Sequence, residues 1–161
     1  HALDPGRPVA ALVRRALLHR SEAADGESAA DDRSLWASAG VLVGGGVTST
    51  VLALNLRAET GGRPSATARA AEAMADAHEP LHLTLRQLLR EPPRWRCAER
   101  PVFVCENPSV VAEAAERLGD AAPPLIATLG RPRAAARTLL GQLRAQNARL
   151  HYRGDLDWPR T

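Results

Sequence analysis

The sequence predicts an α/β protein in which an open parallel sheet of the order βαβαβ follows a mainly α-helical N-terminal domain. Short apolar runs alternate with amphipathic segments over the C-terminal part of the chain, in the order strand, helix, strand, helix, strand. This order implies parallel strands joined by right-handed crossovers. The Pro- and Arg-rich segment PPRWR breaks the chain before them. We therefore expect one domain over residues 1–94 and a second over residues 98–161.

The first domain contains helical patterns and one segment that fits two structures. A helix is expected to begin at Pro8, because apolar residues then recur every three or four positions with arginines on the other side. Residues 66–78 also have a helical composition. The apolar residues from Val51 to Leu56 fit either a strand or a buried helix. Over residues 81–85, leucine alternates with polar residues before the pattern turns helical.

Helix signals separate the strands of the second domain. Val102 to Cys105 form a short apolar run typical of a buried parallel strand. Asn107 suits a helix N-cap and Pro108 the first helical position, and Gly119 suits the residue after the helix. The second strand is expected within PPLIATLG, the second helix begins at Pro132, and the third strand lies within ARLHYRGD.

The composition indicates a globular chain with an aliphatic core. Of 161 residues, 45% are hydrophobic and 24% charged, but only 3% are aromatic. This length allows one domain with a sizeable core, or a small domain and part of another. All 21 basic residues are arginines, since the sequence contains no lysine. Arginine suits bidentate phosphate contacts, although a net charge of +3 does not by itself establish nucleic-acid binding.

Three acidic residues follow strands of the predicted sheet. Glu106 ends the first strand, and Asp155 and Asp157 end the third. Ligands of open α/β sheets bind beyond the carboxyl ends of the strands. If the first and third strands are neighbours, in the order 2-1-3, the three carboxylates meet at one edge and repel one another unless a divalent cation neutralises them. Oxygen ligands without His or Cys favour Mg²⁺ or Mn²⁺, which suits phosphoryl transfer.

Basic residues flank the same predicted edge. Arg131 and Arg133 follow the second strand, and Arg153 lies at the end of the third. These arginines are candidates for holding DNA phosphates. The alternative, equally open from the sequence, is that they are solvated residues at a helix start and a strand end. Tyr152, the single tyrosine of the chain, lies within the third strand.

Several other functions are disfavoured by residue content. The glycine-rich segment 40–50 lacks the lysine of a phosphate-binding P-loop. Cys97 and Cys105 are too few and wrongly spaced for a zinc module. With no disulfide framework and no signal peptide, a reducing cytoplasm is the expected location. No apolar run approaches the ~20 residues of a membrane span.

Three motifs resemble a known fold. VFVCEN, TLGRP and YRGDLDWP together resemble the Toprim domain of topoisomerases, primases and nucleases, and within it the DUF2399 proteins most closely. The resemblance implies that Glu106 ligates metal or acts as general acid or base, and that Asp155 and Asp157 bind Mg²⁺. Members of the family continue with a further helix and strand. The resemblance therefore implies that this chain is shortened at its C-terminus.

The resemblance also implies a function. DUF2399 proteins are similar to type VI topoisomerase A subunits and to the nuclease subunits of SMC-like, Wadjet-type plasmid-defence systems. The expected protein is a Mg²⁺- or Mn²⁺-dependent DNA nuclease subunit that works with SMC-like ATPase complex subunits and does not enter a membrane. Whether it forms a homodimer is left open. The alternative is a catalytically incomplete Toprim-like module that binds DNA or a protein partner without cleaving DNA.

Overall fold

The computed structural model describes residues 8–25, 35–36, 39, 41 and 47–154. The chain divides into two compact units, His1–Gly46 and Val47–Thr161. Among the described residues, no helix is long and apolar enough to cross a membrane.

Most of the described residues of the first unit belong to one helix. Helix α1 spans Pro8–Asp25, which confirms the helix expected from Pro8. Ala10 and Leu17 on this helix are buried together with Leu35 and Trp36. The spacing of Ala10 and Leu17 is seven residues, so both lie on one face of the helix.

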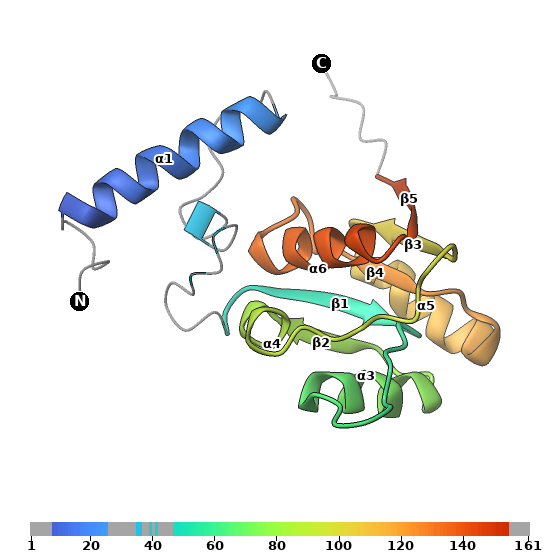
Figure 1. The fold of residues 1–161 in the computed structure, drawn as a ribbon. Coiled ribbons are helices and arrows are strands. Elements are labelled where there is room, and N and C mark those ends of the chain that lie inside the picture. The colour runs from blue at the N-terminus through green and yellow to red at the C-terminus, as the bar shows by residue number, and fades with distance from the viewer. Residues whose placement is uncertain (1–7, 26–34, 37–38, 40, 42–46, 155–161) are drawn as a thin grey trace, which may run out of the picture. The chain divides into compact units, whose positions relative to one another are not determined.

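The second unit contains a five-stranded sheet in the order β2-β1-β4-β3-β5 (Figure 1). Strands β3 (Pro101–Cys105), β4 (Leu125–Ala127) and β5 (Arg149–Arg153) are parallel. Strand β3 lies between the other two, so the predicted order 2-1-3 is confirmed. Cys105 is in register with both Ala127 and Arg153, which brings the carboxyl ends of the three strands to one edge.

Two further strands extend this sheet, and here the sequence-based prediction was incomplete. Strands β1 (Thr50–Leu54) and β2 (Leu81–Thr84) form an antiparallel pair, and β1 also pairs antiparallel with β4. The sheet is therefore mixed rather than wholly parallel. Both strands lie in the part of the chain expected to be mainly helical, and the compact units divide at Gly46 rather than at PPRWR.

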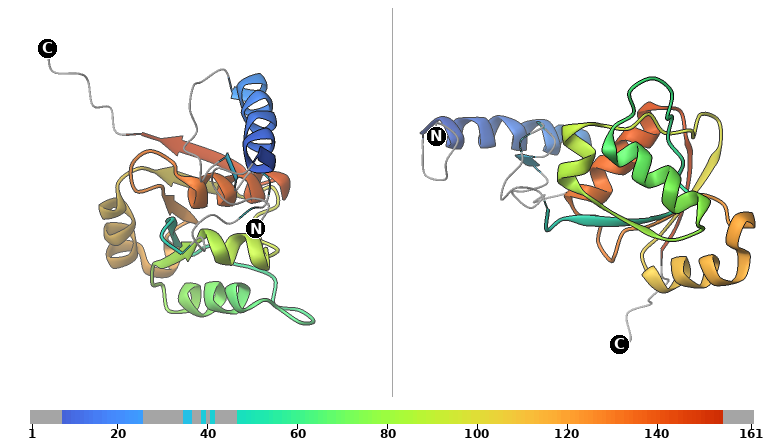
Figure 2. Two further views of the ribbon diagram at one scale, coloured as in Figure 1. Left: turned by 90° about the vertical axis from the view of Figure 1, so that its left-hand side faces the viewer. Right: turned by 90° about the horizontal axis from the view of Figure 1, so that it is seen from below.

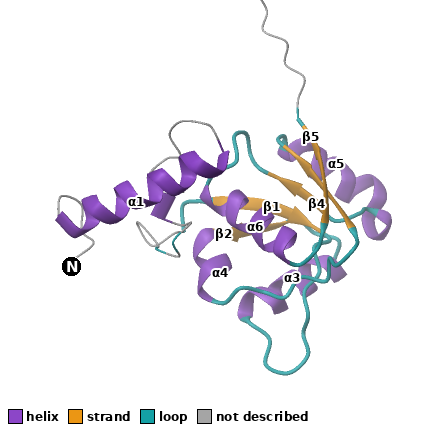
Figure 3. Cartoon of the chain, turned by 45° about the horizontal axis from the view of Figure 1, so that its top comes forward, coloured by secondary structure: helices purple, strands orange, loops and turns teal. Residues whose placement is uncertain are grey.

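Helices cover both faces of the sheet. Helix α5 (Pro108–Leu118) packs on β1 and β4, and helix α6 (Ala134–Ala145) packs on β1 and on helix α4 (Leu85–Arg90). Figure 3 shows α5 and α6 on opposite sides of the strands. Their placement follows from handedness: β4 and β5 flank β3 on opposite sides, so two right-handed crossovers put their helices on opposite faces.

The ends of these helices are capped by local sequence. Asn107 caps α5 and accepts a hydrogen bond from the Ser109 N–H at 2.9 Å, as predicted. Ser65 caps helix α3 (Ala66–Asp76), and Thr84 forms a reciprocal capping box with Gln87 at the start of α4. A short 3₁₀ turn, Gly119–Ala121, follows α5.

Strand β5 forms the edge of the sheet (Figures 1 and 2). All five of its residues are exposed, although its neighbour β3 is buried at Val102, Val104 and Cys105. An edge strand with one neighbour presents one row of backbone groups and both side-chain faces to its surroundings. The β5 edge of the sheet is therefore accessible.

Candidate catalytic site at the carboxyl edge of the sheet

Glu106 is placed by the strand that it follows and by the loop after β4. The Thr128 N–H donates to the Cys105 carbonyl at 2.9 Å, and the Gly130 N–H donates to the Glu106 carbonyl at 3.2 Å. The buried Thr128 hydroxyl donates to the Gly130 carbonyl at 2.6 Å, which closes the loop on itself. Hydrogen bonds from the loop after β4 thus fix the backbone at the end of β3. The side chain of Glu106 is half-buried.

The Glu106 side chain has a partner on β5. The Tyr152 hydroxyl donates a hydrogen bond to the Glu106 carboxylate oxygen Oε1. Tyr152 is in register with Val104, two residues before Glu106 on the neighbouring strand. Side chains alternate along a strand, so the side chains of Tyr152 and Glu106 lie on the same face. The sequence placed Tyr152 within the third strand, but only the strand register places it beside Glu106.

Gly154, the last described residue, also lies beside Glu106. A β-carbon at this position would lie 3.1 Å from Glu106 Oε1 and 3.0 Å from the Tyr152 hydroxyl oxygen. Contacts of this length are tighter than ordinary van der Waals contacts, so a glycine lets the backbone pass close to the carboxylate. The chain therefore reaches Glu106 immediately before the Asp155–Asp157 motif.

The other predicted site residues are placed in part. Asp155 and Asp157 lie outside the described residues. Arg131 and Arg133 are exposed in the loop between β4 and α6, next to Gly130. Arg153 is exposed at the end of β5. The predicted arginines therefore lie at the carboxyl ends of β4 and β5, at the same edge of the sheet as Glu106. Within the described part of the chain, no group of three His, Cys, Asp or Glu side chains is placed to hold a metal ion.

Two family models match the chain. Residues 81–160 match the model described as "Protein of unknown function C-terminus (DUF2399)", and residues 1–58 match the model described as "Protein of unknown function N-terminus (DUF3323)". Residues 81–160 belong to the DUF2399 family. This finding agrees with the family expected from the sequence motifs. Neither a curated protein nor a solved structure matches the chain.

The DUF2399 region contains β2 to β5, Glu106 and both aspartates of the D-x-D motif. The DUF3323 region ends at residue 58 and includes β1. Strand β1 pairs with β2 on one side and β4 on the other. The end of the DUF3323 region is therefore a strand inside the DUF2399 sheet, and the two regions share one core.

The two cysteines of the DUF2399 region are structural. Both are free thiols and both are buried. The Cys105 thiol lies next to Glu106 in sequence but donates to the Ile126 carbonyl at 3.6 Å, within the sheet. Burial raises the pKa of the Cys97 thiol above its ordinary value of 9.0, which disfavours the thiolate. Because the thiolate is the nucleophile, neither position has the exposed, activated character of a catalytic cysteine.

The raised pKa of Cys97 gives a reactivity prediction. In a Cys105→Ala variant, we expect N-ethylmaleimide to modify Cys97 at least roughly tenfold more slowly in the folded chain than in the chain unfolded by urea. Above pH 9.0 the unfolded chain loses the thiol proton before the folded chain does, so stability should fall as pH rises. Mass spectrometry of timed samples measures the reaction. Equal rates in the two states would contradict the burial of this thiol.

Proposed function

We propose that this DUF2399 protein is a Toprim-type nuclease subunit that hydrolyses DNA with Mg²⁺ or Mn²⁺. The proposal depends mainly on one observation: the backbone of Gly154 passes against the Glu106 carboxylate. The acid after the first parallel strand therefore lies beside the residue that directly precedes the D-x-D motif in the sequence, which supports a shared site.

Glu106, Asp155 and Asp157 are the residues that would hold the metal ion. All three supply oxygen ligands, which Mg²⁺ and Mn²⁺ prefer. Such an ion, when bound, orients water and stabilises the charge that develops on a phosphodiester during hydrolysis. The Tyr152 hydroxyl donates to Glu106, which fixes the orientation of this carboxylate.

The proposed DNA contacts use the arginines that follow the strand ends. Arg131 and Arg133 are exposed in the loop whose Gly130 N–H is bound to the Glu106 carbonyl. A phosphate held by this loop would lie at the same edge of the sheet as Glu106. Arginine binds phosphate oxygens through a planar fork of donors, independently of base sequence.

The partner that we propose is an SMC-like ATPase complex that acts in defence against plasmids. This step rests on the resemblance of the VFVCEN, TLGRP and YRGDLDWP motifs to such nuclease subunits. The biochemical consequence is that DNA would be delivered to this subunit, so isolated protein would cleave slowly and with little sequence preference. Co-purification of the subunit with such a complex, tested by affinity capture from a native host, addresses this part of the proposal.

Incubation of the full chain with supercoiled plasmid tests the catalytic part. We expect nicked or linear products with Mg²⁺ or Mn²⁺ and none with EDTA. Calcium serves as a second control, because it binds carboxylates but has looser ligand geometry. DNA binding without cleavage under every metal condition would instead identify a catalytically incomplete module.

The loop arginines give a prediction about salt dependence. For the Arg131→Ala/Arg133→Ala double variant, we expect weaker DNA binding and a slope of log affinity against log salt that is smaller by about 2, because each lost phosphate contact changes it by about 1. Arg144→Ala is the matched control. Arg144 is exposed in the last turn of α6, which ends at the start of β5 and thus at the opposite edge of the sheet. An unchanged slope in the double variant would exclude this loop from the DNA interface.

A further inference from the structure

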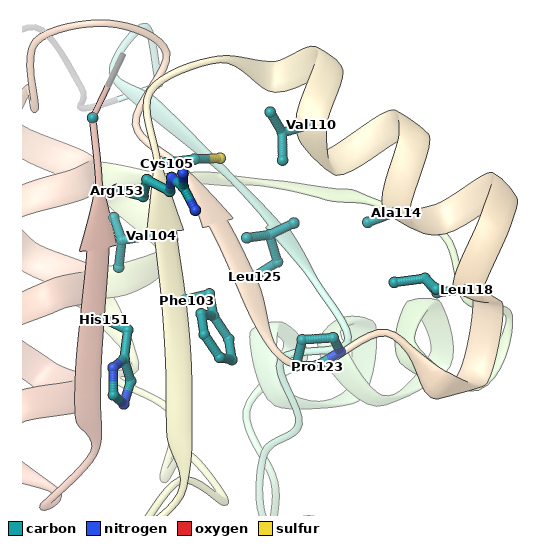
Figure 4. A pocket seen from close by; sticks show the side chains of 11 residues that line it. Phe103, Val104, Cys105, Val110, Ala114, Leu118, Pro123, Leu125, His151 and Arg153 are labelled. Atoms are coloured by element: carbon teal, nitrogen blue, oxygen red, sulfur yellow. The ribbon is translucent and has the colours of Figure 1, made fainter. Parts of the chain in front are cut away.

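A groove lies between helix α5 and the two outer parallel strands, on the face of the sheet that α5 covers only in part (Figure 4). Its volume is about 510 Å³, within the range of about 300–1,000 Å³ that is usual for sites of small organic ligands. One wall is aliphatic and is formed by Val110, Ala114 and Leu118 of α5. The opposite wall is formed by Phe103 and His151 on β3 and β5.

The wall on β3 and β5 is aromatic. Phe103 and His151 are in register, so their side chains leave the sheet on the same face. Their rings are stacked, with centroids 5.3 Å apart and planes 27° apart. Phe103 is 39% exposed. Its neighbours Val102 and Val104, whose side chains lie on the opposite face of β3, are at most 3% exposed. The ring therefore contributes little to the core and presents a flat apolar surface to the groove.

The placement of aromatic residues in this chain is informative. The sequence contains one phenylalanine and one tyrosine, and its core is aliphatic. Tyr152 lies on the Glu106 face of β5 and donates to its carboxylate, whereas Phe103 is exposed on the opposite face, toward the groove. An exposed ring beside an aliphatic wall offers a stacking surface to a planar ligand.

The groove connects to the candidate site through a basic residue. Arg153 lies at its upper end, in register with Cys105, and Figure 4 shows its side chain extending from β5 over β3. Gly154 lines the groove and also borders the Glu106 carboxylate. A ligand whose ring occupies the groove would therefore have its charged end near Arg153, at the strand ends, while the Glu106 carboxylate lies beside Tyr152 on the opposite face. An apolar slot with one arginine at its end matches a nucleotide: the base is planar and the phosphate is anionic.

We propose that this groove binds one unpaired nucleobase between Phe103 and the aliphatic wall of α5, with an adjoining phosphate on Arg153. The inference rests on the proposed function and specifies its substrate. A base in the groove cannot remain paired in a duplex, so the DNA bound at this site carries a single strand or an unpaired nucleotide next to the phosphate that is cleaved. A protein ligand is the competing occupant, and the experiments below distinguish it from a nucleobase.

Binding measured without metal tests the groove separately from catalysis. A fluorescent single-stranded oligonucleotide is titrated against the full chain in EDTA and followed by anisotropy. For Phe103→Ala we expect about tenfold weaker binding of the single strand, the size of a lost base–aromatic stack. Binding of a fully paired duplex should not change. Phe103→Tyr should restore single-strand binding, and Leu150→Ala is the control, since Leu150 is 37% exposed on the other face of β5.

Photo-crosslinking locates the base directly and does not depend on the stability of a variant. An oligonucleotide carrying 5-iodouracil is irradiated with the wild-type chain, and tryptic peptides are analysed by mass spectrometry. Attachment at Phe103 or His151, in the peptides 97–117 or 150–153, supports the proposal. It is overturned if Phe103→Ala binds single strands like the wild type, or if no crosslink falls in these two peptides. Protection of Phe103 and His151 from hydrogen exchange by a protein partner, and not by the oligonucleotide, would also overturn it.

The two proposals fail in different ways. If the full chain cleaves plasmid with Mg²⁺ but Phe103→Ala binds single strands normally, the groove proposal is wrong and the nuclease proposal stands. If no metal supports cleavage but the groove crosslinks to the base, the chain binds unpaired DNA through the groove and the nuclease proposal is wrong.

Discussion

Glu106→Gln is expected to lower Mg²⁺-dependent plasmid cleavage by about a thousandfold, which corresponds to about 4 kcal/mol of activation free energy. The substitution removes one charge from the proposed metal ligands but keeps an oxygen that can accept the Tyr152 hydroxyl hydrogen bond. The fold should therefore be retained. Initial rates of nicking, measured over a range of Mg²⁺ concentrations, give the size of the loss.

A second readout for Glu106→Gln does not depend on activity. A metal ion that binds only the native state raises the melting temperature in proportion to its occupancy. We expect Mg²⁺ to raise the melting temperature of the wild type and to have a much smaller effect on Glu106→Gln. Glu113→Gln is the matched control, because Glu113 is an exposed acid on α5 that pairs with Arg117. Metal-dependent cleavage that survives both Glu106→Gln and Asp155→Asn would show that these acids are not the catalytic set.

The parallel half of the sheet was predictable because its signals are local. The run from Val102 to Cys105 is short and apolar. The start of the next helix is indicated by Asn107 as N-cap and Pro108 as the first helical residue. The order β4-β3-β5 then follows from right-handed crossovers and a switch of direction at β3. These features need no knowledge of distant residues, and the structure confirms them.

The antiparallel half depends on contacts between distant residues. Four of the five residues of β1 are buried, so its sequence lacks the alternation that marks a half-exposed strand. Strand β2 has four residues and continues directly into α4. What identifies β1 as a strand is its pairing with β4, more than 70 residues later in the sequence. No local pattern contains that information.

The site was predictable where it depends on strand order and unpredictable where it depends on exposure. Glu106 directly follows β3, the middle one of the three parallel strands, and the order β4-β3-β5 brings it to the end of β5. Phe103, by contrast, reads as an ordinary core residue in an apolar run, and only its position next to an uncovered edge strand leaves it exposed. The hydrogen bond from Tyr152 to Glu106 required the register of β3 and β5.

Trp95→Ala is expected to destabilise the unit Val47–Thr161 by about 4 kcal/mol, within the range for removing a buried tryptophan. Trp95 lies in the PPRWR segment, which the sequence suggested as a break between domains, yet its side chain is 3% exposed. Its backbone forms a bridge with Ala58, and the Glu59 N–H donates to the Arg94 carbonyl at 2.7 Å. Urea unfolding followed by circular dichroism measures the change.

Helix α6 holds the same segment through two glutamines. Gln142 accepts from the Trp95 indole N–H at 3.1 Å and donates to the Leu88 carbonyl at 2.7 Å. Gln146 accepts from the Trp95 backbone N–H at 2.6 Å. Trp95→Phe keeps most of the packing but leaves the Gln142 oxygen without this donor, so we expect a smaller loss of about 1–2 kcal/mol. Arg94→Ala, at the exposed neighbouring position, is the control and should change stability by less than about 0.5 kcal/mol.

The Trp95 variants also distinguish between two arrangements of the chain. If PPRWR were a linker between independent domains, Trp95→Ala would change stability little, because linkers have few contacts across them. In the structure, the segment joins Ala58, four residues after β1, to helix α6, so losing the Trp95 contacts should weaken β1, α6 and the sheet in one cooperative transition. A loss below about 1 kcal/mol, or two separate unfolding transitions in the wild type, would favour the linker. A single transition with the larger loss would make the end of the DUF3323 region and the DUF2399 region one folding unit.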